Sequence, residues 1–249
     1  MAKGIDHSGM RLGRKAIKTD SRTLRLARYM TALPAPPKAR DWSKGVTSWG
    51  MMKNDELGDC TIAGAAHAIQ VWTANTASEV TLSDDQVLAA YEQWNGYNPA
   101  DPSTDHGGVE LDVLNRWKQQ GLAGHQLLAF ADPAVKNLTE IRQAINLFGG
   151  VYIGLGLPLS AQNQDVWDVA KGPKGKVGSW GGHCVYVLAY DDNSFTCITW
   201  GMTKKMTVAF WKKYCDEAHA LLGGDWLAAN KAPSGFDMAQ LEADLAVLK

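Results

Sequence analysis

The chain has few of the features that mark a secreted, membrane-bound or metal-binding protein. It has four cysteines in 249 residues, at Cys60, Cys184, Cys197 and Cys215, and their spacing matches no metal-binding motif. No apolar run approaches the ~18 residues that span a membrane. We therefore expect reduced cysteines, no metal or cofactor, no secretion or membrane insertion, and a location in a prokaryotic cytoplasm.

The net charge is only −1, but the charges are unevenly distributed. Residues 1–40 contain ten Lys and Arg against Asp6 and Asp20, which gives +8 and leaves −9 for the remainder. Such a basic arm predicts an acidic partner, either a protein surface or nucleic acid, although a solvated tail stays a possible alternative. Tyr29 is the only aromatic residue of the arm, so the arm has few side chains on which nucleic-acid bases could stack. Nucleic acid is therefore the less favoured partner.

A proline-rich spacer at residues 33–37 divides this arm from the rest of the chain. We therefore place a basic arm and spacer at residues 1–40 and one folded domain at residues 41–249. The length and the 45% hydrophobic content suit a single domain of two lobes.

Hydrophobic periodicity predicts a helical first half and a strand-rich second half. Helices are expected at 21–29, 60–73, 83–94, 108–120, 137–148, 208–222 and 236–248, and strands at 125–131, 151–157, 184–190, 195–199 and 205–208. The predicted fold is α+β, with a helical lobe packed on an antiparallel sheet or partial barrel.

Cys60 is the first candidate for chemistry, because it falls in the first turn of a predicted buried helix with Asp59 as a suitable N-cap. The dipole of a helix N-terminus favours the reactive thiolate, although a buried apolar cysteine is the simpler interpretation. A nucleophilic cysteine needs a base, usually a histidine far away in sequence. His183, after Gly181 and Gly182 at the start of a predicted strand, is the best candidate.

The order of five short motifs resembles the papain family of cysteine peptidases. These motifs are Asp41-Trp42, Gly58-x-Cys60, Gly107-Gly108, Gly182-His183 and Trp200-Gly201, spread over about 160 residues. The resemblance implies a papain-like two-lobed fold with Cys60 as nucleophile and His183 as base. It also implies that Gly107, Gly108 and Gly182 line the substrate-binding cleft and that Trp200 covers the catalytic pair from water.

Three positions depart from the family pattern. Asn54 stands where the family has a glutamine that stabilises the oxyanion, and a shift by one residue would put Asp55 there instead. Asp59 replaces the usual serine, and a negative charge there would raise the pKa of the thiol. The third triad residue, an asparagine in the family, falls on Ile198 or Thr199. Thr199 can reach His183 only if a bulge or turn precedes the tryptophan.

Two functions follow from these observations. The first is a cysteine peptidase, or a related thiol acyl-transfer hydrolase, that acts on a peptide or protein substrate and is weakened by loss of the asparagine. The alternative is a catalytically impaired papain-fold structural protein of a phage particle or similar assembly, attached through its basic arm and located in a virion. The arm is shorter than the inhibitory propeptides of papain-type precursors, so we do not expect it to act as one.

Overall fold

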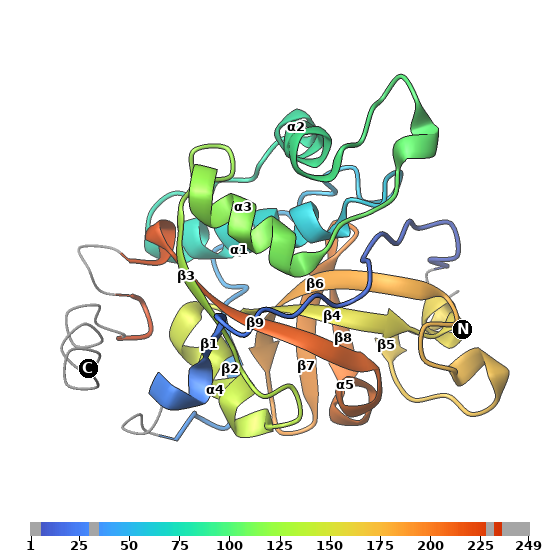
Figure 1. Ribbon diagram of the computed structural model, residues 1–249. Coiled ribbons are helices and arrows are strands. Elements are labelled where there is room, and N and C mark those ends of the chain that lie inside the picture. Colours follow the sequence, from blue (N-terminus) through green and yellow to red (C-terminus); the bar gives the residue numbers. More distant parts are fainter. Residues whose placement is uncertain (1–5, 30–34, 228–231, 236–249) are drawn as a thin grey trace.

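The computed structural model describes residues 6–29, 35–227 and 232–235, in which helices and sheet lie in separate layers (Figure 1). Helices α1 (Cys60–Thr76), α2 (Asp84–Asn95) and α3 (Glu110–Gln120) form one side, and α4 (Leu138–Phe148) and α5 (Val208–Tyr214) lie with the strands. The α+β arrangement predicted from the sequence is confirmed. No helix of the described ranges is long and apolar enough to cross a bilayer.

One nine-stranded sheet forms the second layer. Its strands are β1 (Leu24–Arg25), β2 (Arg40–Asp41), β3 (Leu127–Asp132), β4 (Val151–Leu157), β5 (Val166–Trp167), β6 (Gly181–Tyr190), β7 (Ser194–Thr199), β8 (Met202–Thr207) and β9 (Cys215–Gly223). The order is β1-β3-β9-β4-β6-β7-β8-β5, with β2 also paired to β6. Only the β1–β3 and β5–β8 pairs are parallel among these strands. Short 3₁₀ turns occur at Leu26–Tyr29, Pro102–Thr104, Leu159–Asn163, Pro173–Gly175 and Gly224–Trp226.

Helix α1 lies at the centre of the molecule, with every residue from Cys60 to Thr73 buried. Small residues let it pack closely on the sheet. A Cβ on Gly64 would lie only 3.0 Å from the ring of Tyr152 on β4. Asp59 occupies the N-cap position, but its side chain makes no cap hydrogen bond, so the predicted capping role is wrong.

The helix predicted at residues 208–222 is wrong in its second half. The helix ends at Tyr214, and the following residues form β9 between β3 and β4. Every residue of β9 except Asp216 is buried. A run that is buried on all sides shows neither the helical nor the strand period, so its sequence does not distinguish the two. Pairing with β3 and β4 on its two edges makes it a strand. Residues 21–29 likewise form β1 and a 3₁₀ turn instead of a helix. The helix predicted at 236–248 lies outside the described residues.

The described part of the basic arm packs on the body. In Figure 1 its blue trace runs between helices α1 and α3 and strands β4, β6 and β9 before it reaches β1. His7 is fully buried and Leu26 is 4% exposed. Nζ of Lys18 lies 2.6 Å from Oδ1 of Asp112 on α3. Part of the positive charge of the arm is therefore paired with an acidic residue of the body.

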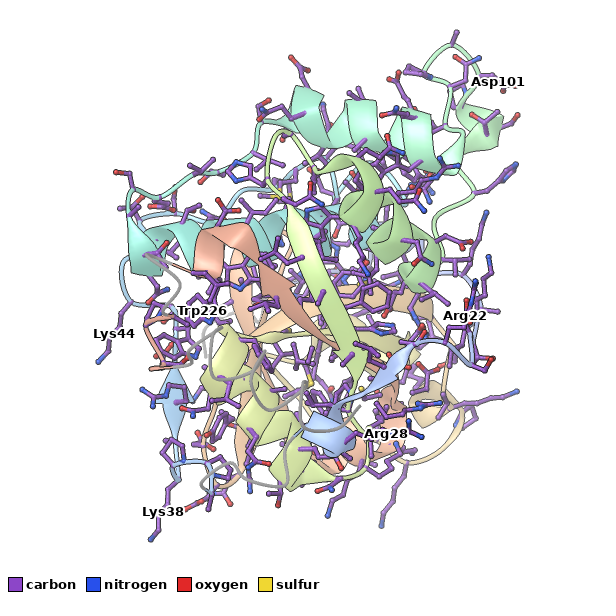
Figure 2. The ribbon with its side chains drawn as sticks, turned by 60° about the vertical axis from the view of Figure 1, so that its left-hand side comes forward. Arg22, Arg28, Lys38, Lys44, Asp101 and Trp226 are labelled. Atoms are coloured by element: carbon purple, nitrogen blue, oxygen red, sulfur yellow. The ribbon has the colours of Figure 1, made fainter. Side chains whose placement is uncertain are left out.

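Other cations of the arm face outward. Arg22 and Arg28 project from the surface where the arm passes over the sheet, whereas Asp101 marks the far tip of the helical layer (Figure 2). The arm therefore has one side bound to the body and another side exposed to solvent.

Candidate active site

Cys60 is the first residue of α1 and is fully buried. Burial raises the pKa of its thiol to about 12, and main-chain hydrogen bonds from Cys184 and Gly13 oppose this rise. Because these bonds favour the thiolate, the groups that make them are N–H donors. Cys184 directly follows His183 on β6. The sulfur of Cys60 therefore lies at the start of β6, beside the residue next to the candidate base.

His183 is held by two neighbours. Its Nε2 lies 2.7 Å from Oγ1 of Thr199, and its ring stacks on Trp200 with centroids 4.7 Å apart and planes 18° from parallel. Its Nδ1 is buried and has no hydrogen-bond partner among the described residues. Burial lowers the pKa of His183 to about 3, so the ring is neutral in this state. Nδ1 therefore makes no hydrogen bond to Sγ of Cys60 in this structure, and the pairing of the two side chains remains a prediction.

A tight turn explains how Thr199 reaches the histidine. Trp200 and Gly201 have φ of 49° and 68° and connect β7 to β8, with Thr199 paired to Met202. Two successive positive φ values are typical of a type I′ hairpin. The strand thus ends at Thr199, and Trp200 lies in the turn itself rather than after it, so strand alternation does not set the direction of its side chain. Of the two positions left open by the sequence, Thr199 is the one that contacts His183.

Asn54 and Asp59 form a buried pair behind Cys60. Nδ2 of Asn54 donates to Oδ1 of Asp59 at 3.0 Å. Burial raises the pKa of Asp59 well above its ordinary value, and the hydrogen bond from Asn54 only partly offsets this. Burial therefore favours the protonated form of Asp59, whereas any negative charge on it raises the pKa of the Cys60 thiol further. The oxyanion role of Asn54 remains a prediction, since this N–H group is aimed at Asp59.

Two of the three glycines predicted to bind substrate backbone, Gly108 and Gly182, bind the backbone of this chain's own arm, whereas Gly107 donates its N–H to the hydroxyl of Tyr91 at 2.8 Å. Gly108 donates its N–H to the carbonyl of Gly13 at 2.8 Å and accepts from Lys15 N–H at 2.8 Å. Arg14 donates its N–H to the carbonyl of Gly182 at 3.0 Å. The arm thus runs as an extended strand, parallel to Gly108, between the two lobes.

The slot around this strand has room for main chain only. A Cβ on Gly13 would lie 1.7 Å from the carbonyl oxygen of Gly58, and one on Gly107 would lie 1.8 Å from the carbonyl oxygen of Gly13. A Cβ on Gly182 would lie 2.3 Å from the carbonyl oxygen of Arg14. The glycines on both sides therefore allow the arm to reach Cys60.

Arg14 places its side chain in a cluster that the sequence did not predict. Its Nε lies 2.8 Å from Glu110, and its Nη2 lies 2.6 Å from Glu217 and 2.7 Å from Asp216. Glu110, Glu217 and His219 also offer ligand atoms within 4.8 Å of one another, the arrangement of a metal site, but the guanidinium group of Arg14 contacts both glutamates. The opposite charges of arm and body were the only sequence signal of this contact.

The fold is similar to those of solved cysteine proteases. Xylellain, a cysteine protease from Xylella fastidiosa, gives a TM-score of 0.64 at 12% identity, over 89% of this chain and 98% of that one. A cysteine protease from Carica candamarcensis gives 0.54 at 14% identity, over 75% and 98%. A procathepsin B from Trypanosoma congolense gives 0.57 at 10% identity, over 85% and 86%. No protein-family model and no curated protein matches the sequence.

These similarities establish a papain-like fold for this chain. At identities of 10–14% they speak for the fold alone, and the roles of individual residues depend on the geometry described above.

Proposed function

We propose that this chain is a papain-like cysteine peptidase that its own N-terminal arm keeps in a latent form. The observation that carries the proposal is the position of the arm. An extended peptide lies on Gly108 and Gly182, next to a buried cysteine at a helix N-terminus and a histidine whose second nitrogen is fixed. A cleft that binds main chain beside such a pair is suited to attack on a peptide bond.

In the proposed reaction, Cys60 attacks the carbonyl carbon of a bound peptide while Nδ1 of His183 takes the thiol proton. The carbon–nitrogen bond breaks, His183 returns the proton to the leaving amine, and a thioester remains on Cys60. Water, deprotonated by the same imidazole, then releases the acid product and restores the thiol. Thr199 keeps the ring oriented, and the N–H of Cys60 with the amide of Asn54 is the proposed oxyanion site.

The arm blocks this reaction without becoming its substrate. In the proposal the main-chain N–H of Gly13 faces the sulfur, while its carbonyl oxygen accepts the N–H of Gly108. The arm also keeps Cys60 buried, which favours the unreactive thiol over the thiolate. Peptidase activity in the proposal therefore requires that residues 10–15 leave the cleft.

A single substitution in the complete chain tests this proposal. Gly13→Ala would put a Cβ 1.7 Å from the carbonyl oxygen of Gly58, which forces the arm out of the slot. Gly9→Ala is the matched control, because nothing lies within 4 Å of a Cβ at that position. We expect Gly13→Ala to hydrolyse peptides and to be labelled at Cys60 by an epoxide inhibitor of thiol proteases. The native chain and Gly9→Ala should do both far more slowly.

Two further variants make the outcome decisive. Cys60→Ala in the Gly13→Ala background should abolish both hydrolysis and labelling. His183→Ala in that background should lower both strongly, because the thiol loses its base. A folded Gly13→Ala protein, judged by circular dichroism, that neither hydrolyses peptides nor labels at Cys60 would refute the peptidase.

The second candidate is a catalytically impaired structural protein of a phage particle or similar assembly. It is favoured by the exposed cations of the arm, such as Arg22 and Arg28, and by a threonine where the family has an asparagine. A folded but inactive Gly13→Ala variant, together with salt-sensitive binding of the native chain to an acidic surface, is the result this candidate expects.

A further inference from the structure

The cluster around Arg14 is built as a receptor for one guanidinium group. The Arg14 side chain is 4% exposed, and the side chains of Glu110 and Glu217 are 0% and 6% exposed. Glu110 is the first residue of α3 and follows Gly108, which binds the arm's main chain, by two positions. Glu217 lies on β9. One wall of the pocket is therefore continuous with the segment that holds the arm's main chain.

The floor of the pocket fits the flat guanidinium group. Gly154 on β4 lies between Cys184 on β6 and Glu217 on β9. A Cβ at Gly154 would lie 2.2 Å from Cζ of Arg14, so the absence of a side chain there is what admits the group. Lys could bring a charge to this place, but it would act from a single nitrogen, whereas the planar fork of Arg contacts Glu110 through Nε and Glu217 through Nη2.

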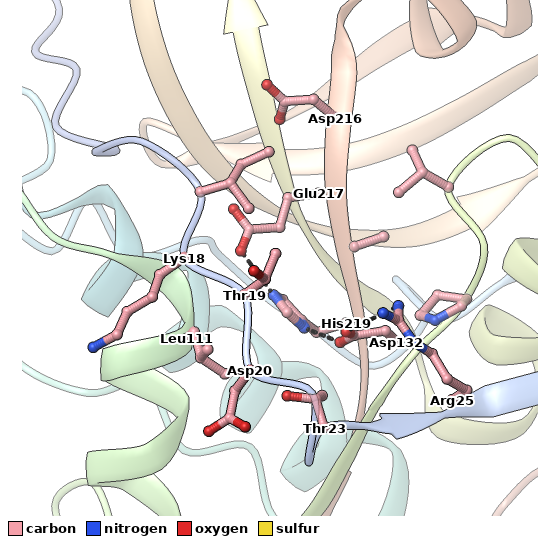
Figure 3. Close-up of a pocket in the computed structure, with 14 residues that line it drawn as sticks. Lys18, Thr19, Asp20, Thr23, Arg25, Leu111, Asp132, Asp216, Glu217 and His219 are labelled. Carbon is pink, nitrogen blue, oxygen red and sulfur yellow. Dashed lines mark hydrogen bonds and ion pairs between the residues drawn. The ribbon is translucent and has the colours of Figure 1, made fainter.

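The carboxylates depend on the cation in the pocket. Neither carboxylate oxygen of Glu110 has a hydrogen bond among the described residues, and its contacts are ion pairs with Arg14 at 2.8 Å and with His219 at 3.8 Å. His219 is itself committed, because its ring lies between Asp132 at 2.7 Å and Glu217 at 3.2 Å (Figure 3). When Arg14 leaves, the glutamates lose their principal cationic partner.

We propose that this pocket selects the substrate, and that it takes an arginine side chain of a peptide whose backbone lies between Gly108 and Gly182. The inference rests on the proposed function, since it names the substrate class of the same cleft. Arg14 then acts as a built-in competitor for a site that an arginine-containing peptide occupies after the arm has left. The four groups that specify the arginine are Glu110, Glu217, Asp216 and Gly154.

The first test needs no catalysis. Arg14→Ala in the complete chain removes the guanidinium, and methylguanidinium is added back while thermal unfolding is followed in the presence of EDTA. We expect Arg14→Ala to lower the unfolding temperature and methylguanidinium to restore part of it. Ethylammonium should restore less. Lys18→Ala, which removes an arm cation bound outside the pocket to Asp112, should show no recovery. Absence of any recovery in a folded Arg14→Ala protein would overturn the proposal.

The second test measures selectivity in the open cleft. The double variant Gly13→Ala/Cys60→Ala is mixed with short blocked peptides that differ at one position, Arg, Lys, citrulline or Leu, and binding is measured by fluorescence anisotropy. Citrulline keeps the shape of arginine without its charge. We expect the arginine peptide to bind at least about tenfold more tightly than the citrulline peptide. Equal binding of the two would refute the inference.

Substitution of the pocket completes the test. Glu217→Gln and Gly154→Ala in the same background should each remove the arginine preference, the first through charge and the second through space. Arginine-selective binding without hydrolysis by Gly13→Ala would refute the proposed peptidase activity but not the proposed arginine pocket. Hydrolysis by Gly13→Ala with no preference for arginine over citrulline would refute the proposed arginine pocket but not the proposed peptidase activity.

Discussion

Nε2 of His183 lies 2.7 Å from Oγ1 of Thr199, where the papain family pattern has an asparagine. A hydroxyl group can hold the ring as an amide does, and it can either donate or accept the hydrogen bond. The indole ring of Trp200 stacks on a face of the imidazole ring and further limits the rotation of His183. The bond therefore occupies Nε2 and leaves Nδ1 without a hydrogen-bond partner among the described residues, and Nδ1 is the atom that the proposed reaction uses as base.

The first prediction concerns this bond. In the Gly13→Ala background, Thr199→Val keeps the side-chain shape but removes the hydroxyl. We expect kcat to fall by about tenfold, the size of one lost hydrogen bond, with little change in KM. Thr199→Ser should stay close to the parent. Equal kinetics of the valine and serine variants would show that the hydroxyl does not orient the base.

The second prediction concerns the reactivity of Cys60 with iodoacetamide. The position at a helix N-terminus favours a reactive thiolate, but burial raises the thiol pKa to about 12. The native chain should therefore label slowly at neutral pH, and labelling should increase as the pH rises. In Gly13→Ala, Cys60 should label faster than Cys184, Cys197 and Cys215, which stay buried. Peptide mass spectrometry measures this, and equal labelling of all four in that variant would contradict it.

The third prediction concerns removal of residues 1–32. The division into an arm at residues 1–40 and a folded domain at 41–249 predicts that the remaining domain folds, and the buried Leu26 and His7 predict that it is less stable. Burial of Leu26 alone stabilises the fold by about 1.5–3 kcal/mol. His7 also covers one face of Trp200, with ring centroids 5.2 Å apart. We expect a folded domain with a clearly lower unfolding temperature. An unchanged temperature in calorimetry would show that the arm is dispensable for stability.

The sequence was a good guide where one strand or helix decides the outcome. The stop of α3 at Gly121, the Ser83–Gln86 capping box and the strand 151–157 were all predicted from local patterns. The sequence left Ile198 and Thr199 open for the position beside His183, and the turn at Trp200 and Gly201 decides for Thr199. The sequence could not separate helix from strand in the buried run at 215–223, because tertiary pairing decides there.

The position of the arm between the two lobes could not be predicted from local sequence patterns, for a different reason. The contact of Arg14 with Glu217 joins residues 203 positions apart, and it depends on how α3, β4 and β9 meet. Composition gave the opposite charges but not their geometry. The length of the arm argued against an inhibitory role, but Gly13, Arg14 and Lys15 alone make the main-chain hydrogen bonds to Gly108 and Gly182, and the proposed inhibition needs no longer segment.

The last prediction concerns stability against pH. Burial, together with the negative charge of Glu217, raises the pKa of Glu110 from 4.5 to about 8, although Arg14 and His219 oppose the rise. Burial lowers the pKa of His219, but hydrogen bonds to Asp132 and Glu217 outweigh it and raise the value from 6.5 to about 9. Both groups hold protons more strongly in the folded chain than in the unfolded chain.

A raised pKa has the same consequence for an acid and a base. The stability that each group contributes is complete below its unfolded pKa and is lost as the pH rises through its folded pKa. For Glu110 the loss extends from 4.5 to about 8, and for His219 from 6.5 to about 9. The contribution of these two groups to the free energy of unfolding should therefore fall from pH 4.5 to about pH 9, most steeply between pH 6.5 and about 8, where both lose stability. Urea denaturation of Glu110→Gln, which cannot titrate at this position, should give a shallower fall over the same range. Parallel curves for the native chain and Glu110→Gln would mean that Glu110 is already ionised well below pH 6.5, and that the ion pair with Arg14 outweighs its burial.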